Sequence, residues 1–325
     1  LLQKKVKMPT SIGYGNGYQI SYMNSGKMTN KGWEFRVDAV PFQNKDWRVG
    51  VYFNIAHNEN KITEMPDNYI EENYTFGNGN YAYRREEGRP MGSFYGYRYK
   101  GVYQNKDATY ARDIEGNVMK DISGNAIVMR NGSYTVAPGD AIYEDVNHDG
   151  VINQYDIVYL GNSNPRLTGG AGLNVSYKQF KLSAIFYGRY GQDVVNATRL
   201  NNESMRGIDN QSTAVLRRWR NEGDQTDIPR ALYGEGYNTL GSDRFVEDAS
   251  YLRLKSLSFT YRLPKKAIQR WGFNNIDVYV TGYNLFTWTN YTGQDPEVKT
   301  ENTYAKDTAT TPASIQLVAG FNLSF

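Results

Sequence analysis

Several segments of this chain alternate apolar and polar residues over runs of about ten residues, which is the length of a transmembrane β-strand. Residues 33–39 place Trp, Phe, Val and Ala at every second position, with Glu, Arg and Asp between them. The same alternation recurs at residues 47–55, 171–177, 180–186, 257–263 and 315–325, and more weakly at 276–280. Because successive side chains of a strand point to opposite faces, each segment predicts a strand with one apolar and one polar face.

The connections between these segments alternate between short and long. Short connections fall at residues 41–46, 178–179 and 264–275, and long ones at residues 59–165, 187–255 and 290–314. Outer-membrane barrels show this asymmetry, since they have short periplasmic turns and long extracellular loops. A soluble β-sandwich also alternates apolar and polar residues, but nothing in its architecture requires short and long connections to alternate.

Aromatic residues gather near the ends of the predicted strands, and the last residue, Phe325, is aromatic too. The aromatic residues at strand ends are Trp33, Trp47, Tyr177, Phe180, Trp271 and Trp288. Aromatic side chains form girdles at both membrane–water interfaces of outer-membrane barrels. We therefore predict an all-β fold, a transmembrane antiparallel β-barrel with long extracellular loops and short periplasmic turns, embedded in the lipid of the outer membrane.

Composition excludes several other classes of protein. The mean hydropathy is −0.67, and no apolar run reaches the roughly 18 residues of a transmembrane helix. The formal net charge of +3 is too small to indicate a nucleic-acid partner. The chain has no Cys and two histidines, His57 and His148, which leaves little basis for a nucleophilic triad or a thiolate metal site. We therefore expect no enzyme activity.

The order of short and long connections also predicts sidedness. With the long connections outside the cell, residues 47–58 run outward and residues 166–177 run inward, so the stretch between them holds no complete spanning strand or an even number. The segment "GSFYGYRYKGVYQ" at 92–104 has strand character, and we place it as β structure within an extracellular loop region at 59–165. Seven spanning strands are expected, with the end of an eighth at residues 1–8. Bacterial barrels usually close on an even number, so residues 1–325 are expected to be the C-terminal part of a larger barrel.

The segment "DVNHDGVINQYD" at 145–156 has the layout of a 12-residue calcium loop. Such loops supply oxygen ligands at positions 1, 3, 5, 7, 9 and 12, with Gly at position 6 for a sharp turn. The corresponding ligands are Asp145, Asn147, Asp149, the carbonyl of Val151, Asn153 and Asp156, and the glycine is Gly150.

Position 12 of this loop departs from the EF-hand pattern, because Asp156 replaces the usual bidentate Glu. The shorter side chain, similar to that of dockerin-type loops, predicts a weak Ca²⁺ site of the extracellular kind, with a structural role in ordering a long surface loop. The alternative is that these Asp, Asn and Gly residues are present only because they favour turns.

One helix is predicted within the long connections. Residues 212–230 are the best candidate, with Ser212 or Thr213 as the N-cap and Gly223 ending the helix. A position within an outer loop would let this helix contact a partner protein or line a substrate chamber. Packing of the loop around Trp219 is an equally good interpretation.

Several motifs, in order along the chain, resemble the SusC/RagA-type TonB-dependent transporters. They include "NSGKMTNKGWEFRVDAV", "GRPMGSFYGYRYKGVYQ", "GDAIYEDVNHDGVINQYDIVYLGNSNPRLTGGAGLNVSY" and the final "GFNLSF". The resemblance implies a full barrel of about 22 strands, filled by an N-terminal plug domain that is absent from these residues. It also implies a SusD-like surface lipoprotein that delivers substrate, and energy supplied through TonB with ExbB and ExbD.

The function predicted from this resemblance is active import of a large nutrient, most often an oligosaccharide and in some members a peptide. A passive or structural outer-membrane barrel, such as an adhesin or scaffold, is the alternative from a different class. A soluble calcium-dependent carbohydrate-binding module is a more distant one, because the lipid-facing alternation argues against folding without a membrane.

Overall fold

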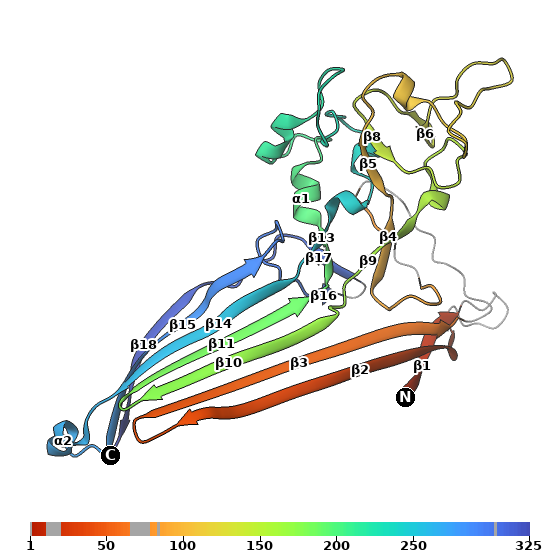
Figure 1. Ribbon diagram of the computed structural model, residues 1–325. Helices are drawn as coiled ribbons and strands as arrows, with labels where there is room; N and C mark the ends of the chain where they lie inside the picture. Colours follow the sequence, from red (N-terminus) through yellow and green to blue (C-terminus); the bar gives the residue numbers. More distant parts are fainter. Residues whose placement is uncertain (1, 11–20, 66–78, 83–84, 302–303) are drawn as a thin grey trace.

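The computed structural model describes residues 2–10, 21–65, 79–82, 85–301 and 304–325. These residues form a long sheet and, at one end of it, a compact unit built from the long connections, as Figure 1 shows. We call this unit the loop unit, and we call that end of the sheet the loop end. The opposite end, where short turns join the strands, is the turn end.

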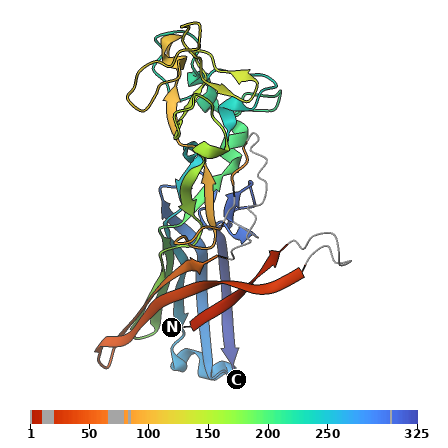
Figure 2. The same ribbon diagram turned by 90° about the vertical axis from the view of Figure 1, so that its right-hand side faces the viewer.

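The large sheet has eight strands, and each pair of neighbours is antiparallel. In spatial order they are β1 (Leu2–Thr10), β2 (Ser21–Gln43), β3 (Trp47–Glu64), β10 (Leu167–Tyr177), β11 (Phe180–Tyr190), β14 (Tyr251–Arg262), β15 (Asn275–Thr289) and β18 (Gln316–Ser324). Figure 2 shows that the sheet twists strongly, so that β1 and β2 cross the direction of β18. The predicted seven strands and the end of an eighth are confirmed.

The parity argument is also confirmed, because β3 pairs directly with β10 and no strand of the large sheet lies between them in the described chain. Strand β3 continues to Glu64, beyond the predicted end at residue 58, because β2 also extends and pairs with it as far as Lys27. The predicted two-residue turn at 178–179 joins β10 to β11, and Lys178 adopts a left-handed backbone conformation there.

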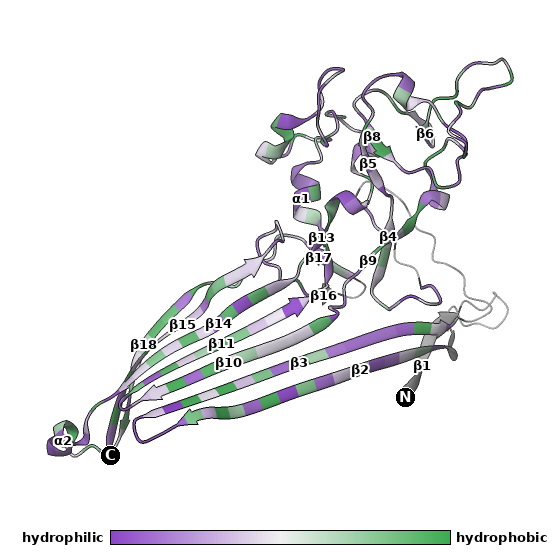
Figure 3. Cartoon of the chain, viewed as in Figure 1, coloured by the Kyte–Doolittle hydropathy of each residue, from purple (hydrophilic) through white to green (hydrophobic). Residues whose placement is uncertain are grey.

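One face of the large sheet carries apolar side chains and the other carries polar ones, which Figure 3 shows as alternating colours along the strands. We call the apolar face the outward face and the polar face the inward face. On the outward face, Val51, Leu173, Ala184 and Leu257 are successive cross-strand partners. Large apolar side chains such as Phe35, Phe321 and Leu317 stay more than half exposed there, at 53%, 67% and 75%. An apolar face this exposed indicates contact with lipid.

The register places a row of mostly aromatic side chains across the turn end of the outward face. Successive partners from β3 to β18 are Trp47, Tyr177, Phe180, Tyr261, Val278 and Phe321. The ring centroids of Trp47 and Tyr177 are 4.3 Å apart, and those of Phe180 and Tyr261 are 4.8 Å apart. Three residues of the predicted aromatic girdle, Trp47, Tyr177 and Phe180, lie in this row, whereas Trp33 and Trp288 lie nearer the loop end. The row supports the assignment of the outward face to lipid.

The loop unit contains short strands that do not join the large sheet. The first long connection supplies the antiparallel pairs β4 (Ser93–Gly96) with β9 (Val158–Asn162), β5 (Tyr99–Val102) with β8 (Ala141–Tyr143), and β6 (Arg130–Asn131) with β7 (Tyr134–Thr135), and the 3-10 turns η1 (Asp107–Thr109) and η2 (Gln154–Asp156). The prediction of β structure at 92–104 outside the barrel sheet is therefore confirmed.

The other long connections add the remaining elements. These are β12 (Asp193–Asn196), α1 (Ala197–Asn202), the 3-10 turns η3 (Thr213–Arg217), η4 (Tyr237–Thr239) and η5 (Asp243–Phe245), and the strands β13 (Val246–Asp248), β16 (Thr300–Glu301) and β17 (Tyr304–Asp307). At the turn end, α2 (Lys265–Ile268) and η6 (Gln269–Trp271) fill the connection between β14 and β15. In the part of the chain that the structure describes, no helix has the length and apolar character needed to cross a membrane.

The predicted helix at 212–223 is wrong. Ser212 does cap the segment, since its side chain accepts a hydrogen bond from the Ala214 N–H, but only the 3-10 turn η3 follows. The chain then extends at Arg218, and the Trp219 N–H donates to the Ile228 carbonyl over 2.9 Å. Tertiary packing of the Trp219 ring against Gly139, where a Cβ would approach the ring to 2.3 Å, outweighs the local helix propensity.

Candidate functional site: the loop end of the sheet

The three long connections meet at the loop end and form a common core. Strand β12 pairs with β13 and, in parallel, with β17, so the second and third connections share one small sheet. The first connection joins them through the side chains of Tyr81 and Phe94, which pack with Val195 and Phe245. The described parts of the three connections are therefore packed together, and they form the candidate functional site at the loop end.

The main core of the loop unit is rich in tyrosine. Its buried members include Tyr95, Tyr97, Tyr103, Tyr143 and Tyr237, which come from the first and second connections. Burial raises the pKa of Tyr143 and of Tyr237 well above the ordinary value of a phenol. The Tyr143 hydroxyl donates to the Tyr237 carbonyl over 3.0 Å, so this hydroxyl joins two segments that are distant in the sequence.

The segment predicted as a calcium loop is compact and is held by its own side chains. The Asp145 carboxylate accepts from the Gly150 N–H at 2.9 Å, and the Asp149 carboxylate accepts from the Val151 N–H at 2.8 Å. The Asn147 side chain contacts Asp149 at 2.9 Å. Gly150 has a φ of +78°, a conformation that glycine adopts easily and that the sharp turn of a calcium loop requires.

Asp156, the predicted ligand at position 12, has a different set of partners. The side chain is fully buried, and its two oxygens accept from the backbone N–H groups of Val146 and Asn153, both at 2.8 Å. Burial raises the pKa of the Asp156 carboxyl, although these N–H donors lower it. Asn153 also caps η2, where its side chain accepts from the Tyr155 N–H. Asp156 therefore closes the loop, whether or not an ion is bound.

The donor set still fits a hard cation that prefers oxygen. Asp145, Asn147, Asp149 and Asn153 bring side-chain oxygens into one loop, and Val151 adds a carbonyl that accepts from the Asn153 side chain at 3.1 Å. Among the described residues, no group of three or more His, Cys, Asp or Glu side chains converges closely enough to hold a metal ion. Calcium binding by the predicted ligands, which rely partly on amide and carbonyl oxygens, stays a prediction.

A short tandem repeat, which was not predicted, packs directly against this loop. Residues 113–117 read DIEGN and residues 121–125 read DISGN. In each copy the leading Asp accepts from the backbone N–H groups two and four residues later, and the Gly has a positive φ. Backbone hydrogen bonds join Ala111, Met119 and Ile127 in a closed triangle below these turns. The eight-residue spacing of the two motifs was a readable sequence signal.

The glycine of the predicted calcium loop lies at the base of this repeat. A Cβ on Gly150 would approach the Ala111 Cβ to 2.9 Å, and the Ile152 N–H donates to the Arg130 carbonyl at 2.7 Å. Ile152, the apolar residue at position 8, is fully buried in the tyrosine-rich core. The order of the exposed repeat therefore depends on the shape of the loop at 145–156.

A buried ion pair joins the first long connection to the second. The Asp140 carboxylate is fully buried and accepts from the Arg230 Nε at 2.7 Å, from the Tyr134 hydroxyl at 2.7 Å and from the Ala137 N–H at 2.8 Å. Asn238 donates to it at 3.3 Å. A carboxylate with this many donors is well stabilised without solvent.

A second charged network links α1 to the sheet of β12, β13 and β17. Arg199 contacts Glu203 at 3.0 Å and Glu247 at 3.1 Å, and the buried Arg244 also contacts Glu203. Burial tends to raise the pKa of the Glu247 carboxyl, but hydrogen bonds from Thr292 and Arg199 outweigh it, and the pKa lies below its ordinary value. Glu247 is therefore held as a carboxylate that binds all of these segments together.

The third long connection is anchored to the inward face by Arg253 of β14. Its guanidinium is 3% exposed and contacts Asp295 at 2.6 Å and Glu297 at 2.9 Å. Arg253 also donates to the Thr287 hydroxyl at 2.8 Å, within the neighbouring strand β15. These contacts hold the connection over the polar side of the sheet.

The two histidines have structural partners. His57 Nδ1 lies 2.7 Å from the Arg166 carbonyl, and its ring lies beside Trp33 at a centroid distance of 5.9 Å. His148 has a φ of +56° and contacts the Arg112 carbonyl over 3.3 Å. Neither contact involves a hydroxyl or carboxylate of the kind that a catalytic triad requires.

The comparisons with known proteins agree with this architecture. The TonB-dependent receptor P3 of Formosa agariphila is 32% identical over 301 residues, which cover 90% of this chain and 28% of that receptor. The TonB-dependent receptor SusC of Bacteroides thetaiotaomicron is 27% identical over 333 residues, covering 100% of this chain and 29% of SusC. No protein-family model matches the chain.

A solved structure of the RagAB peptide transporter superposes with a TM-score of 0.71 at 26% identity, covering 97% of this chain and 31% of that one. The same transporter in a closed-closed state gives a TM-score of 0.72 at 26% identity, covering 99% of this chain and 32% of that one. The sheet is therefore part of a transmembrane antiparallel β-barrel. The chain belongs to the SusC/RagA-type TonB-dependent receptors, and it spans less than a third of the length of the relatives it matches.

Proposed function

We propose that this chain forms the barrel wall and surface loops of an outer-membrane active transporter that imports a large nutrient. The observation that carries the proposal is the match to the TonB-dependent receptor P3 over 90% of the chain. Import in such a protein draws on energy delivered by TonB with ExbB and ExbD. The plug domain and the segment that contacts TonB are assigned to the portion of the relatives that this chain does not cover.

The loop end is assigned to the cell surface in this proposal. The turn end has short connections and the loop end has long ones, which is the orientation of outer-membrane barrels. Two buried charged networks, around Asp140 and around Glu247, keep the loop unit rigid above the inward face. A rigid surface platform of this kind suits the docking of a SusD-like lipoprotein that hands over the substrate.

An oligosaccharide is the proposed substrate class. A row of neutral polar side chains crosses the inward face, with Asn174, Ser183, Ser258 and Thr281 as successive partners. Hydrogen bonds of 2.8 Å join Asn174 to Ser183 and Ser258 to Thr281. Hydroxyl and amide groups exchange hydrogen bonds readily with sugar hydroxyls. A peptide is the second candidate, and the likeness to the RagAB peptide transporter favours it.

Uptake by a strain that lacks the full-length receptor tests this proposal. The strain, and the same strain carrying the receptor, would be grown on single glycans or on peptides as the sole carbon source. Active import predicts that the receptor restores growth on one class and that a protonophore or loss of TonB abolishes uptake. Uptake that continues without TonB would instead identify a passive barrel.

Calcium is proposed as a structural ion of the loop at 145–156. The proposal rests on the oxygen donors that Asp145, Asn147 and Asp149 bring together and on the glycine turn at Gly150. The expected role is to fix the base of the repeat at 113–125, on the surface where the lipoprotein is proposed to dock. No step of import depends on the chemistry of the ion.

A further inference from the structure

The inward face of the sheet carries a cluster of cations and tyrosines close to the loop end. Tyr187 of β11 and Tyr251 of β14 lie on this face, with their ring centroids 6.3 Å apart. The Arg189 guanidinium lies 6.0 Å from the centroid of the Tyr187 ring, and its Nε donates to the Tyr187 hydroxyl over 3.3 Å. The cluster follows from the register of the two strands, which makes Arg189 the cross-strand partner of Tyr251.

The carboxylates beside this cluster neutralise two cations and leave Arg189 without a counter-charge. Arg253 contacts Asp295 and Glu297, as described above. The Lys255 ammonium lies 2.7 Å from Glu297, so two carboxylates face these two cations. Arg189 forms no ion pair with a carboxylate of the described residues, and its side chain is partly exposed. The inward face therefore presents one uncompensated positive charge at this point.

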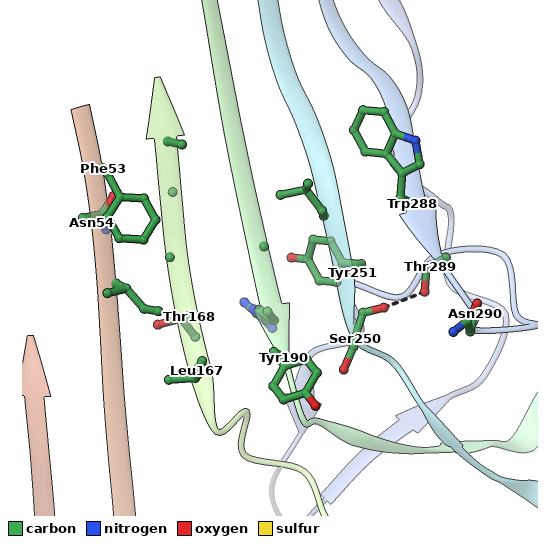
Figure 4. A pocket seen from close by; sticks show the side chains of 17 residues that line it. Phe53, Asn54, Leu167, Thr168, Tyr190, Ser250, Tyr251, Trp288, Thr289 and Asn290 are labelled. Carbon is green, nitrogen blue, oxygen red and sulfur yellow. Dashed lines mark hydrogen bonds between the residues drawn. The ribbon is translucent and has the colours of Figure 1, made fainter. Parts of the chain in front are cut away.

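The Tyr251 hydroxyl, next to Arg189, is an unsatisfied polar group. Tyr251 is 5% exposed, and its hydroxyl has no hydrogen-bond partner within the described part of the chain. Figure 4 shows the Tyr251 ring reaching from β14 toward β11, the strand that carries Arg189. Buried polar groups almost always have a partner, so a buried hydroxyl without one indicates a partner that these residues do not supply.

The surface on the other side of Arg189 is polar and open. The cross-strand partner of Arg189 on β10 is Thr168, and Gly170 follows it on the same face. A Cβ on Gly170 would lie 3.1 Å from the Asn54 amide oxygen, so the Asn54 side chain extends along this glycine. Figure 4 shows Asn54 on β3 and Thr168 on β10. A ligand that contacts Arg189 therefore also meets a hydroxyl and an amide.

We propose that Arg189, with the Tyr251 hydroxyl beside it, binds a negatively charged substituent of the transported oligosaccharide, a carboxylate or a sulfate. A guanidinium binds either oxyanion through charge-assisted hydrogen bonds. The hydroxyl of Thr168 and the amide of Asn54 suit the neighbouring sugar hydroxyls. This inference rests on the proposed function, because it requires the inward face to line the path of an imported oligosaccharide.

The first test is uptake of labelled oligosaccharides by a strain that lacks the full-length receptor and by the same strain carrying it. The probes are matched pairs: uronic-acid oligosaccharides with their methyl esters, and sulfated oligosaccharides with their desulfated forms. We expect receptor-dependent uptake of an acidic member and at least tenfold less uptake of its neutral form, and the pair that responds distinguishes carboxylate from sulfate.

The other outcomes of this uptake test separate the inference from the proposed function. Uptake confined to neutral oligosaccharides or to peptides would overturn the inference and leave active import standing. A preference for the acidic member that persists after loss of TonB would support the site at Arg189 and refute active import.

Substitution of Arg189 tests the site itself. With the acidic oligosaccharide as the probe, Arg189→Gln should raise the half-saturating concentration about tenfold or more, because charge-assisted hydrogen bonds are lost. Arg36→Gln is the matched control. Arg36 lies on the same inward face as the cross-strand partner of Asn54, but it already pairs with Asp38. This control should change the half-saturating concentration less than about twofold, and equal effects of the two substitutions would refute the assignment.

A second variant guards against misfolding of the first. Tyr251→Phe removes the hydroxyl and keeps the ring and the charge of the site. The melting temperature should not fall, because the hydroxyl has no partner in the described chain, whereas the half-saturating concentration should rise several-fold. Uptake of the acidic oligosaccharide that is unchanged in both Arg189→Gln and Tyr251→Phe would overturn the proposal.

Discussion

Replacement of Asp140 by Ala should loosen the attachment between the first and second long connections. The substitution removes the shared buried acceptor of Arg230, Tyr134 and Asn238, and it leaves these three donors without it. Breaking a buried ion pair by removing one partner costs about 3–5 kcal/mol. The lower end applies here, because 33% of the Arg230 side chain reaches solvent and water can screen the remaining charge.

A loss of about 3 kcal/mol corresponds to about a hundredfold increase in the fraction of time that this part of the loop unit is open. Hydrogen exchange followed by mass spectrometry on the full-length receptor measures that fraction directly. The peptides that cover residues 134–143 and 228–240 should exchange about a hundredfold faster, because both contain donors to Asp140. Peptides from β10 and β11 should not change, since the barrel strands do not contact this pair.

Glu144→Ala provides a matched control from the same segment. Glu144 contacts Arg98 at 3.3 Å and Lys100 at 3.1 Å, but all three side chains are about a third to a half exposed. Exposed ion pairs contribute between about 0 and 1 kcal/mol, so this variant should accelerate exchange less than about fivefold. If Asp140→Ala changes exchange no more than Glu144→Ala, the buried pair does not hold the connections together.

Three further predictions concern the loop unit. Calcium should raise the melting temperature of the parent receptor but not that of Asp145→Ala combined with Asp149→Ala, and identical melting of the parent in calcium and in EDTA would rule the site out. Gly150→Ala should increase limited proteolysis of the loop unit more than Gly116→Ala does. Both glycines have a positive φ, a conformation that costs alanine about 1–2 kcal/mol. At Gly150 the added Cβ would also be too close to Ala111, whereas at Gly116 it would meet no other atom. Glu247→Gln should lower the melting temperature at pH 7, because the folded pKa of Glu247 lies below its unfolded value and its stabilisation is present above that unfolded value. The difference from the parent should shrink as the pH falls through the folded pKa, and a constant difference would contradict the assignment.

The sheet was largely readable from the sequence. The strict alternation at 171–177 and 180–186, together with the two-residue turn at 178–179, corresponds to β10 and β11, and Trp47, Tyr177 and Phe180 do share an aromatic row. Local patterns suffice in such strands because one face must be apolar along its whole length to contact lipid. The extension of β3 to Glu64 was missed, because its outer part pairs with β2 through polar residues that show no alternation.

The loop unit was less readable, because its structure depends on contacts between distant segments. Nothing local to Asp140 indicates that Arg230 pairs with it, and Ser212 correctly predicts a cap without predicting that Trp219 turns the chain away. The repeat at 113–125 can be recognised in the sequence from its two similar motifs, but nothing in the sequence indicates that it packs against Gly150.

The sequence by itself determined the fold class and the strands of the large sheet, because lipid contact and short turns impose rules on neighbouring residues. It also indicated the family, through motifs that resemble those of the family's members. Only the tertiary structure decided how the three long connections join. It also decided that the Asp156 carboxylate accepts hydrogen bonds from backbone N–H groups of its own loop. The tertiary structure alone also decided that Arg189 and Tyr251, on different strands, meet at one level of the inward face. The register between strands determines which residues of neighbouring strands lie side by side, and register is a property of the assembled sheet.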